Sequence, residues 1–208
     1  MSSIKVLVAQ PVNPKVNSSL WEENANKIFK SLTFENKAQG MFKEKVSAEG
    51  GPFARHARVR NELIDKYLED DITHVLWFDS DIVEWPDNII ESLLGVSAKD
   101  IVAPYVYIED NEWWNFKRFY DISCFKDSLG PNFNFKAPYN LFSGDKTSYV
   151  SCVGTAFIVP AYLHRKIRYD PYYDSNEHIF FFNKAQEHGA RIIATPDIDV
   201  RHAFLPKY

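Results

Sequence analysis

Two aspartates separated by a single residue, Asp79 and Asp81, form the pattern in the sequence that most directly suggests chemistry. They follow the apolar run at 75–78, which predicts that both carboxylates emerge at the carboxyl end of a buried strand. Ligands of open α/β sheets bind at that edge, and alternate residues of an extended chain point the same way. The pair could therefore hold one divalent cation or one sugar–phosphate group. A polar turn after a strand would give the same pattern, which recurs at Asp197 and Asp199.

The helix predicted at 52–70, before this strand, carries polar side chains on its otherwise apolar face. Arg60 and Asn61 occupy positions there that a core-facing helix normally fills with apolar groups. A charge in such a place is expected where a site needs it, and an anionic ligand such as a nucleotide would account for it. Arg55 and Arg58 could add to the same positive charge. Alternatively, the Arg60 side chain extends along the apolar surface to a surface carboxylate.

The overall composition excludes several classes of protein. The chain has 208 residues, enough for one sizeable domain, and 45% of them are hydrophobic. With 24 Lys and Arg against 28 Asp and Glu, its net charge of −4 gives no general attraction to nucleic acid or anionic membranes. No apolar run approaches the roughly 20 residues of a membrane-spanning helix, and the N-terminus shows no signal-peptide pattern. We therefore expect a cytoplasmic protein with no nucleic-acid partner and no membrane segment, and with Cys124 and Cys152 as free thiols.

Strands and helices are predicted to alternate along the chain. The expected strands lie at 4–9, 73–78, 100–106, 149–159, 190–194 and 198–200, with a further short one at 45–48. The expected helices lie at 18–32, 52–70, 86–94 and 176–188. Such alternation predicts one α/β domain with a mostly parallel central sheet flanked by helices. The aromatic segment at 108–142 is expected to supply mainly core, with Trp113 or Trp114 at a cleft where sugar rings stack.

The order of these motifs resembles that of the GT-A fold glycosyltransferases. The run A-R-V-R-N-E-L at 57–63, followed by a strand and D-S-D at 79–81, is similar to the family's basic helix, hydrophobic strand and D-x-D motif. The segment at 150–159 looks like the family's strand with a glycine where the acceptor approaches. Residues 174–202 are similar to its acidic-motif helix, strand and terminal histidine. The resemblance covers nearly the whole chain and extends to a chlorovirus glycosyltransferase domain.

This resemblance implies where a nucleotide sugar and its metal would bind. Residues 1–106 would form the nucleotide-sugar-binding half, and 107–208 the acceptor-binding half, of one Rossmann-like GT-A domain. The donor-binding residues expected from the pattern and the resemblance are Gln10, Pro11, Val12, Arg55, Arg60, Asn61, Asp79 and Ser80, the first three around the base. The metal ligands that it implies are Asp79, Asp81 and His202, a set that suits Mn²⁺ or Mg²⁺. The metal would neutralise charge on the leaving nucleoside diphosphate.

The catalytic base is expected at the start of the helix at 176–188, where this chain departs from the family pattern. Inverting members commonly have Glu-Asp there, whereas this chain has Glu177 followed by His178. We expect Glu177, and after it Asp174, to deprotonate the acceptor hydroxyl. The spacing of Asp174 and Glu177 also fits a capping box, and the two roles are compatible.

The sequence thus predicts a metal-dependent glycosyltransferase that moves a hexose from a nucleoside-diphosphate sugar, with UDP as the expected nucleotide, to a carbohydrate hydroxyl. The chain could be one domain of a larger polypeptide. One alternative is a haloacid-dehalogenase-like phosphatase with Asp79 as nucleophile and Asp81 as acid, although 78 residues precede the motif. Another is a non-catalytic sugar-nucleotide-binding module, which would bind without turnover. A dinucleotide-binding domain is disfavoured because no glycine-rich turn follows the first predicted strand.

Overall fold

A computed structural model of the chain describes residues 4–11, 37–38, 52–108, 118–119, 126–127, 148–172 and 177–203. Several predictions fall outside these residues: the helix at 18–32, the strand at 45–48, Val12, Asp174, Cys124, Trp113 and Trp114. Cys152 is a buried free thiol, as expected. Among the described helices, none combines the length and the apolar character needed to cross a bilayer.

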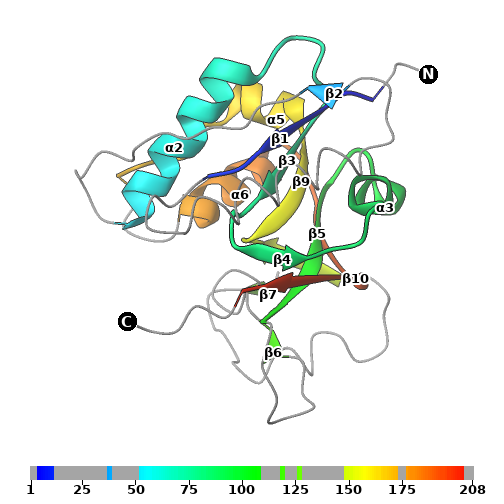
Figure 1. The fold of residues 1–208 in the computed structure, drawn as a ribbon. Coiled ribbons are helices and arrows are strands. Elements are labelled where there is room, and N and C mark those ends of the chain that lie inside the picture. Colours follow the sequence, from blue (N-terminus) through cyan, green and yellow to red (C-terminus); the bar gives the residue numbers. More distant parts are fainter. Residues whose placement is uncertain are drawn as a thin grey trace.

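The strands assemble into one mixed sheet (Figure 1). In chain order they are β1 (Val6–Ala9), β2 (Lys37–Ala38), β3 (His74–Phe78), β4 (Ile82–Glu84), β5 (Ile101–Ile108), β6 (Arg118–Phe119), β7 (Lys126–Asp127), β8 (Ser148–Cys152), β9 (Ala156–Pro160) and β10 (Ile192–His202). Their order across the sheet is β2-β1-β3-β9-β5-β10-β8-β7. β4 pairs with β10, and β6 pairs with β5.

Most strands at the centre of this sheet run in one direction. β1 is parallel to β2 and β3, and β10 is parallel to β5. β9 lies between β3 and β5 and is antiparallel to both, so that β3 and β5 again share one direction. The predicted mostly parallel α/β sheet is confirmed, and β9 is an inserted antiparallel strand that the sequence pattern does not indicate.

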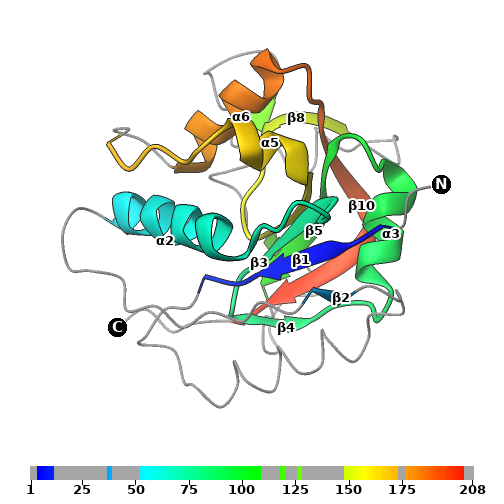
Figure 2. The ribbon, with the colours of Figure 1, turned by 90° about the horizontal axis from the view of Figure 1, so that it is seen from above.

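Helices cover both faces of the sheet (Figures 1 and 2). α2 (Pro52–Tyr67), α5 (Ala161–Lys166) and α6 (Glu177–Glu187) pack on one face, and α3 (Ile89–Val96) packs on the other. Successive residues of a strand point to opposite faces. In β1, Leu7 and Ala9 therefore join the core beneath α2, α5 and α6, whereas Val6 and Val8 join the core beneath α3. Because both faces are covered, β1 and β3 are buried along their whole length.

The predicted end of the helix at 176–188 is confirmed in atomic detail. Gly189 follows α6 with φ +81°, a conformation that glycine adopts without strain. The Gly189 N–H donates to the Gln186 carbonyl at 2.9 Å, and the Ala190 N–H donates to the Ala185 carbonyl at 3.0 Å. These two bonds form a Schellman motif, which satisfies carbonyls that the end of the helix would otherwise leave without donors.

The strand predicted at 149–159 is in fact two strands. β8 pairs with β10, whereas β9 lies between β3 and β5, so the chain has to change position in the sheet at 153–155. The sequence also does not predict the short elements β4 and α5. The helix expected at 86–94 begins later, at Ile89, and continues through Gly95.

The strands predicted at 190–194 and 198–200 are instead one long strand, β10. Its register beside β5 shifts between Thr195, which is opposite Pro104, and Asp199, which is opposite Tyr105. Proline has no N–H to donate to a neighbouring strand, which accounts for an irregularity at this place. The pairing resumes after the shift, and β10 therefore extends as far as His202.

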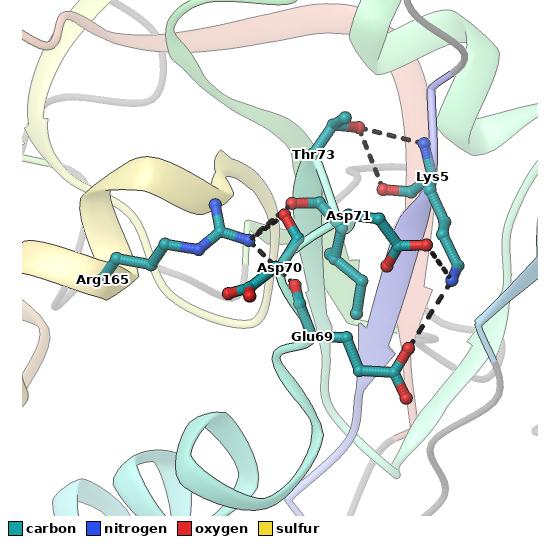
Figure 3. Close-up of polar contacts among 7 residues, drawn as sticks. Lys5, Glu69, Asp70, Asp71, Thr73 and Arg165 are labelled. Atoms are coloured by element: carbon teal, nitrogen blue, oxygen red, sulfur yellow. Dashed lines mark hydrogen bonds and ion pairs between the residues drawn. The ribbon is translucent and has the colours of Figure 1, made fainter.

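The turn that leads from α2 into β3 is held by polar contacts from two other elements (Figure 3). Arg165 of α5 donates from Nη2 to the main-chain oxygens of Glu69, Asp70 and Ile72, at 2.9, 3.1 and 2.9 Å. From the side of β1, the Lys5 main chain exchanges hydrogen bonds with the Thr73 hydroxyl, and Lys5 Nζ lies 2.7 Å from Asp71 Oδ2. These contacts fix the position of α2 relative to the strand that follows it.

Removing the Arg165 guanidinium is expected to destabilise the fold. Arg165→Ala should lower the free energy of unfolding by about 1–2 kcal/mol, because three main-chain oxygens lose a charged donor that water replaces only in part. Urea denaturation followed by circular dichroism measures the change. Lys99→Ala, at an exposed lysine elsewhere on the protein, is the control. Equal unfolding midpoints for the two variants would contradict the role of Arg165.

Candidate functional site

The D-x-D pair lies where the sequence predicts, at the carboxyl end of β3. Asp79 directly follows this strand, and residues 80–81 form the turn into β4. The Asp79 N–H donates to the Thr155 carbonyl at 3.0 Å, which attaches the turn to the start of β9. Because 80–81 form a turn and not extended chain, the two carboxylates have different neighbours: Asp79 faces Arg60, and Asp81 faces His202. The extended chain expected at 79–81 is therefore wrong, and a turn takes its place.

Asp81 and His202 meet although they are far apart in the sequence. Asp81 Oδ1 lies 2.8 Å from His202 Nε2, and His202 Nδ1 lies 2.8 Å from the Ala203 carbonyl. The antiparallel pairing of β10 with β4 places His202 opposite Ile82 and so brings the histidine to the turn. Burial by itself lowers the pKa of His202. The net pKa is nevertheless raised above its ordinary value, because the imidazole bonds to Asp81 and to the Ala203 carbonyl and is attracted by the charges of Asp81 and Asp79.

The chemistry of this pair fits a divalent cation. A carboxylate and an imidazole in contact are a donor set that suits Mn²⁺. Among the residues that the structure describes, no group of three or more His, Cys, Asp or Glu side chains is arranged to hold a metal ion. A cation at Asp81 and His202 would therefore need further oxygen ligands from a bound molecule or from a shift of Asp79. The partly exposed side chains of Asp79 and Asp81, at 31% and 19%, are accessible to such a molecule.

Arg60 is buried beside the first aspartate. Its side chain is 3% exposed, and its Nη2 lies 3.6 Å from Asp79 Oδ1 and 3.4 Å from His178 Nε2. Its guanidinium carbon lies 4.7 Å from the ring centroid of Trp77, within the range of a cation–π contact. Within the described part of the chain, Arg60 Nε and Nη1 have no hydrogen-bond partner. The predicted inward direction of Arg60 is confirmed, and the carboxylate that it reaches belongs to the D-x-D pair.

Asn61 lies next to Arg60 but has a different environment. Its Nδ2 donates to the Tyr169 carbonyl at 2.8 Å, and its Oδ1 accepts from the Tyr169 N–H at 2.9 Å. Both polar atoms of the side chain thus hold the segment that leads toward α6. Donor binding by Asn61 stays a prediction, and the structure shows that the residue positions the chain.

The other predicted donor-binding residues lie at or near the same sheet edge. Gln10 and Pro11 follow β1, which is the parallel neighbour of β3, and Gln10 is 2% exposed. Among described residues, Gln10 Nε2 has no hydrogen-bond partner. Ser80 is buried in the D-x-D turn, and Arg55 is half-buried in the first turns of α2. Binding of a nucleotide-sugar donor by these residues stays a prediction.

The start of α6 joins this site through buried polar groups. Glu177 is 2% exposed, and its Oε1 lies 3.4 Å from His56 Nδ1 and 3.5 Å from His178 Nε2. Burial by itself raises the pKa of Glu177, but the hydrogen bond from His56 and the charge of Arg60 lower it to about 2. Burial, together with the charge of Arg60, lowers the pKa of His178 to about 3. At neutral pH, therefore, Glu177 is ionised and His178 is neutral.

Sequence reasoning missed His56 and the aromatic surroundings of Arg60. His56 is four residues before Arg60 and therefore lies on the same face of α2, one turn closer to its N-terminus. That spacing is a signal that could have identified it. Strand alternation in β3 places the ring of Trp77 on the face toward Arg60. No local pattern links Trp77 with Phe157 and Tyr169, whose rings also lie near the Arg60 guanidinium.

Comparisons with known proteins identify a matching family and similar folds. The family model described as Anp1 matches residues 15–132. A crystal structure of A197 from STIV has a TM-score of 0.56 and 15% identity, covering 98% of this chain and 86% of that one. A crystal structure of GalNAc-T7 with UDP, GalNAc and Mn²⁺ has a TM-score of 0.56 and 14% identity, covering 99% of this chain and 38% of that one. The search of curated proteins gave no significant match.

At identities this low, the similarity to solved structures is evidence for the fold alone. It confirms the predicted GT-A fold class. The narrower likeness to a chlorovirus domain stays a prediction.

The contacts of Glu177 predict a pH-dependent contribution to stability. Because its pKa is lower in the folded protein than the ordinary value of 4.5, its ionised carboxylate stabilises the fold above that pH. This contribution is lost as the pH falls from 4.5 toward 2. Glu177→Gln should therefore lower the free energy of unfolding by about 2–3 kcal/mol at pH 7, with a difference that shrinks below pH 4.5.

Chemical denaturation at a series of pH values from 7 to 3 measures this difference. Glu187→Gln, at an exposed glutamate near the other end of α6, is the matched control and should change stability by less than about 0.5 kcal/mol. A difference between Glu177→Gln and the wild type that stays constant across this pH range would show that the carboxylate is not held ionised by its neighbours.

Proposed function

The chain belongs to the Anp1 family of glycosyltransferase-like proteins, and from this premise we propose that it is a metal-dependent hexosyltransferase of the GT-A type. Its donor would be a nucleoside-diphosphate sugar, with UDP as the expected nucleotide, and its acceptor a carbohydrate hydroxyl. The observation that carries the proposal is the contact between Asp81 and His202 at the carboxyl end of β3. Two metal-ligand groups meet there, at the edge of the sheet where such folds bind nucleotides.

The donor is proposed to lie across the ends of β1 and β3. Gln10 and Pro11, with Val12 outside the described residues, would receive the base. Buried Gln10 Nε2 has no hydrogen-bond partner among the described groups, and this supports the assignment because buried polar groups normally have partners. Asp79 and Ser80 would face the ribose and diphosphate side. Positive charge from Arg60, which lies beside Asp79 and next to Asn61 in the chain, and from Arg55 in the first turns of α2 would favour the anionic part of the donor.

A divalent cation, Mn²⁺ or Mg²⁺, would be held by Asp81 and His202, with Asp79 and diphosphate oxygens as further ligands. When bound, it would supply positive charge that stabilises the leaving nucleoside diphosphate. The imidazole of His202 favours Mn²⁺ over Mg²⁺, which prefers oxygen ligands. The protein side chains contribute the fixed geometry: His202 is buried and bonded on both ring nitrogens, so its orientation is set before any ligand arrives.

The acceptor half of the site is proposed to lie within 107–208, with proton removal at the start of α6. Glu177 lies there, and Asp174 precedes it outside the described residues. The family match gives no support to a haloacid-dehalogenase-like phosphatase. A non-catalytic sugar-nucleotide-binding module differs from the proposed enzyme in one property, which is that it would never turn its ligand over.

Metal-dependent nucleotide binding is the first test of the proposal. The melting temperature is measured with UDP, GDP, UDP-glucose, UDP-galactose and GDP-mannose, each with and without Mn²⁺. A ligand at about 100 times its Kd stabilises the folded state by about 2.7 kcal/mol, a shift of a few degrees for a chain of this length. We expect such a shift with a uridine nucleotide only when Mn²⁺ is present.

Asp81→Asn should abolish the Mn²⁺-dependent shift and reduce turnover by at least about 100-fold, because the variant loses a metal-ligand charge. Asp197→Asn, in the second D-x-D pattern, is the matched control and should behave as the wild type. If none of the nucleotides shifts the melting temperature of the wild type, the proposed function is wrong. If Asp81→Asn retains the shift, Asp81 does not bind the metal.

His202→Ala tests the other half of the metal site. The variant should need about 10-fold more Mn²⁺, or higher, for half of the nucleotide-induced shift, because the cation loses one of two preoriented protein ligands. A Mn²⁺ titration of the melting temperature at saturating nucleotide measures this requirement. His188→Ala, at an exposed histidine just after α6, controls for general effects of removing an imidazole. Equal Mn²⁺ titrations for the two variants would remove His202 from the site.

A further inference from the structure

A continuous series of polar contacts leads from the D-x-D pair to one exposed imidazole. Asp79 Oδ1 lies 3.6 Å from Arg60 Nη2, which lies 3.4 Å from His178 Nε2. His178 Nε2 in turn lies 3.5 Å from Glu177 Oε1, and that oxygen lies 3.4 Å from His56 Nδ1. The side chains of Arg60, His178 and Glu177 are 3%, 7% and 3% exposed, whereas that of His56 is 55% exposed. His56 is thus the more exposed end of a network whose three middle members are buried, and Asp79 is its partly exposed other end.

The position of His56 in the fold places it beside the proposed donor site. α2 leads into β3 and packs beside it in the opposite direction, so the N-terminal turns of α2 lie at the carboxyl end of β3 (Figure 1). Arg60 is level with Asp79 at that edge. His56 is four residues, or about 6 Å, further along the helix axis, beyond the end of the strand. An acceptor would approach a donor bound at the D-x-D turn from this side, beyond the carboxyl end of β3.

The contact between His56 and Glu177 has the arrangement of a carboxylate–imidazole pair. An ionised carboxylate accepts the Nδ1–H of a neutral imidazole and leaves Nε2 with a free lone pair. The lowered pKa of Glu177 keeps its carboxylate in the form that accepts this bond. With 3% of its side chain exposed, Glu177 is itself poorly placed to touch a sugar hydroxyl, whereas the half-exposed imidazole of His56 is accessible.

The neighbouring groups do not compete for this task. His178 is buried with its Nε2 toward Arg60, and the pKa of its imidazole is lowered to about 3, so it does not accept a proton at neutral pH. Phe53, three residues before His56 on the same helix face, is 46% exposed. An exposed aromatic ring beside an imidazole is a surface on which the C–H face of a sugar can stack. A carbohydrate acceptor would therefore find an apolar platform and a proton-accepting nitrogen one turn apart.

We infer that His56 is the catalytic base, which takes the proton of the acceptor hydroxyl on Nε2, and that buried Glu177 is the positioning residue that orients its imidazole. The inference rests on the proposed function, and it replaces direct proton removal by Glu177 at the start of α6 with an orienting role for that carboxylate. In the transfer step, the acceptor O–H bond breaks and its proton passes to His56. The acceptor oxygen forms a bond to the anomeric carbon, and the bond from that carbon to the diphosphate oxygen breaks, leaving its electron pair on the nucleoside diphosphate. His56 then releases the proton to solvent.

The test compares His56→Ala with His188→Ala, which removes an exposed histidine outside the network. Release of nucleoside diphosphate is measured from the sugar nucleotide that gives the largest Mn²⁺-dependent melting shift, with simple methyl glycosides as acceptors. His56→Ala should lower kcat by about 100-fold or more, the contribution typical of a general base, and should leave the donor Kd within about twofold. Added imidazole should restore part of the lost rate in His56→Ala and should not affect His188→Ala. Because its side chain is 55% exposed, the His56→Ala variant is expected to fold, with a small loss of stability from the missing hydrogen bond to Glu177.

Glu177→Gln provides a second, independent readout. It should lower kcat about 10- to 100-fold with little change in donor Kd, and imidazole should not rescue it, because the imidazole is present but misoriented. A kcat for His56→Ala within threefold of the wild type would overturn this inference alone. So would a loss of donor binding that parallels the loss of rate and that imidazole does not reverse. Absence of donor binding in the wild type would instead overturn the proposed function itself.

Discussion

The burial of one positive charge, the Arg60 guanidinium, constrains how three elements of this fold come together. Arg60 extends from α2, Asp79 follows β3, and His178 lies in the first turn of α6. A buried charge without partners costs several kcal/mol, so the fold is stable only when these elements lie close enough for Arg60 to keep its contacts. The ring of Trp77, 4.7 Å from the guanidinium carbon, adds a cation–π contact in the same place. The D-x-D turn is therefore positioned by the core as well as by its strand.

This constraint gives the two aspartates of the motif different environments. Asp79 faces a buried cation that belongs to the protein, whereas Asp81 faces His202 at the end of β10. Asp81 and His202 are thus the pair that remains suited to an added cation. The charge of Asp79 still contributes to the raised pKa of His202, so the two carboxylates act on one imidazole despite their different contacts. The proposed metal site and a protein-held ion pair thus involve two aspartates that are separated by a single residue.

The same arrangement separates the two groups of residues to which we assign the donor and acceptor halves of the proposed transfer reaction. The ends of β1 and β3, with the terminal strand β10, gather the groups suited to a nucleotide and a cation. The first turns of α2, with the start of α6, gather a buried carboxylate, an exposed imidazole and an exposed aromatic ring. Arg60 and His178 join the two groups through contacts of 3.6 Å or less. Next to Arg60, Asn61 holds the segment at Tyr169 in place through two hydrogen bonds to its main chain.

Local patterns in the sequence determined several secondary-structure elements and the direction of one buried side chain. The apolar strand before Asp79, the inward direction of Arg60 and the stop at Gly189 follow from the nearest few residues, because strand alternation, helical periodicity and left-handed glycine are local properties. Tertiary structure alone decided that β9 is inserted antiparallel between β3 and β5, that Asp81 touches His202, and that His56 meets Glu177. These are contacts between segments that are far apart in the sequence. The spacing of residues within one segment does not determine which distant side chain packs against it. Asn61 is a further example. Its residue type and position suggested a ligand contact, but only the tertiary structure shows that its partner is the main chain of Tyr169.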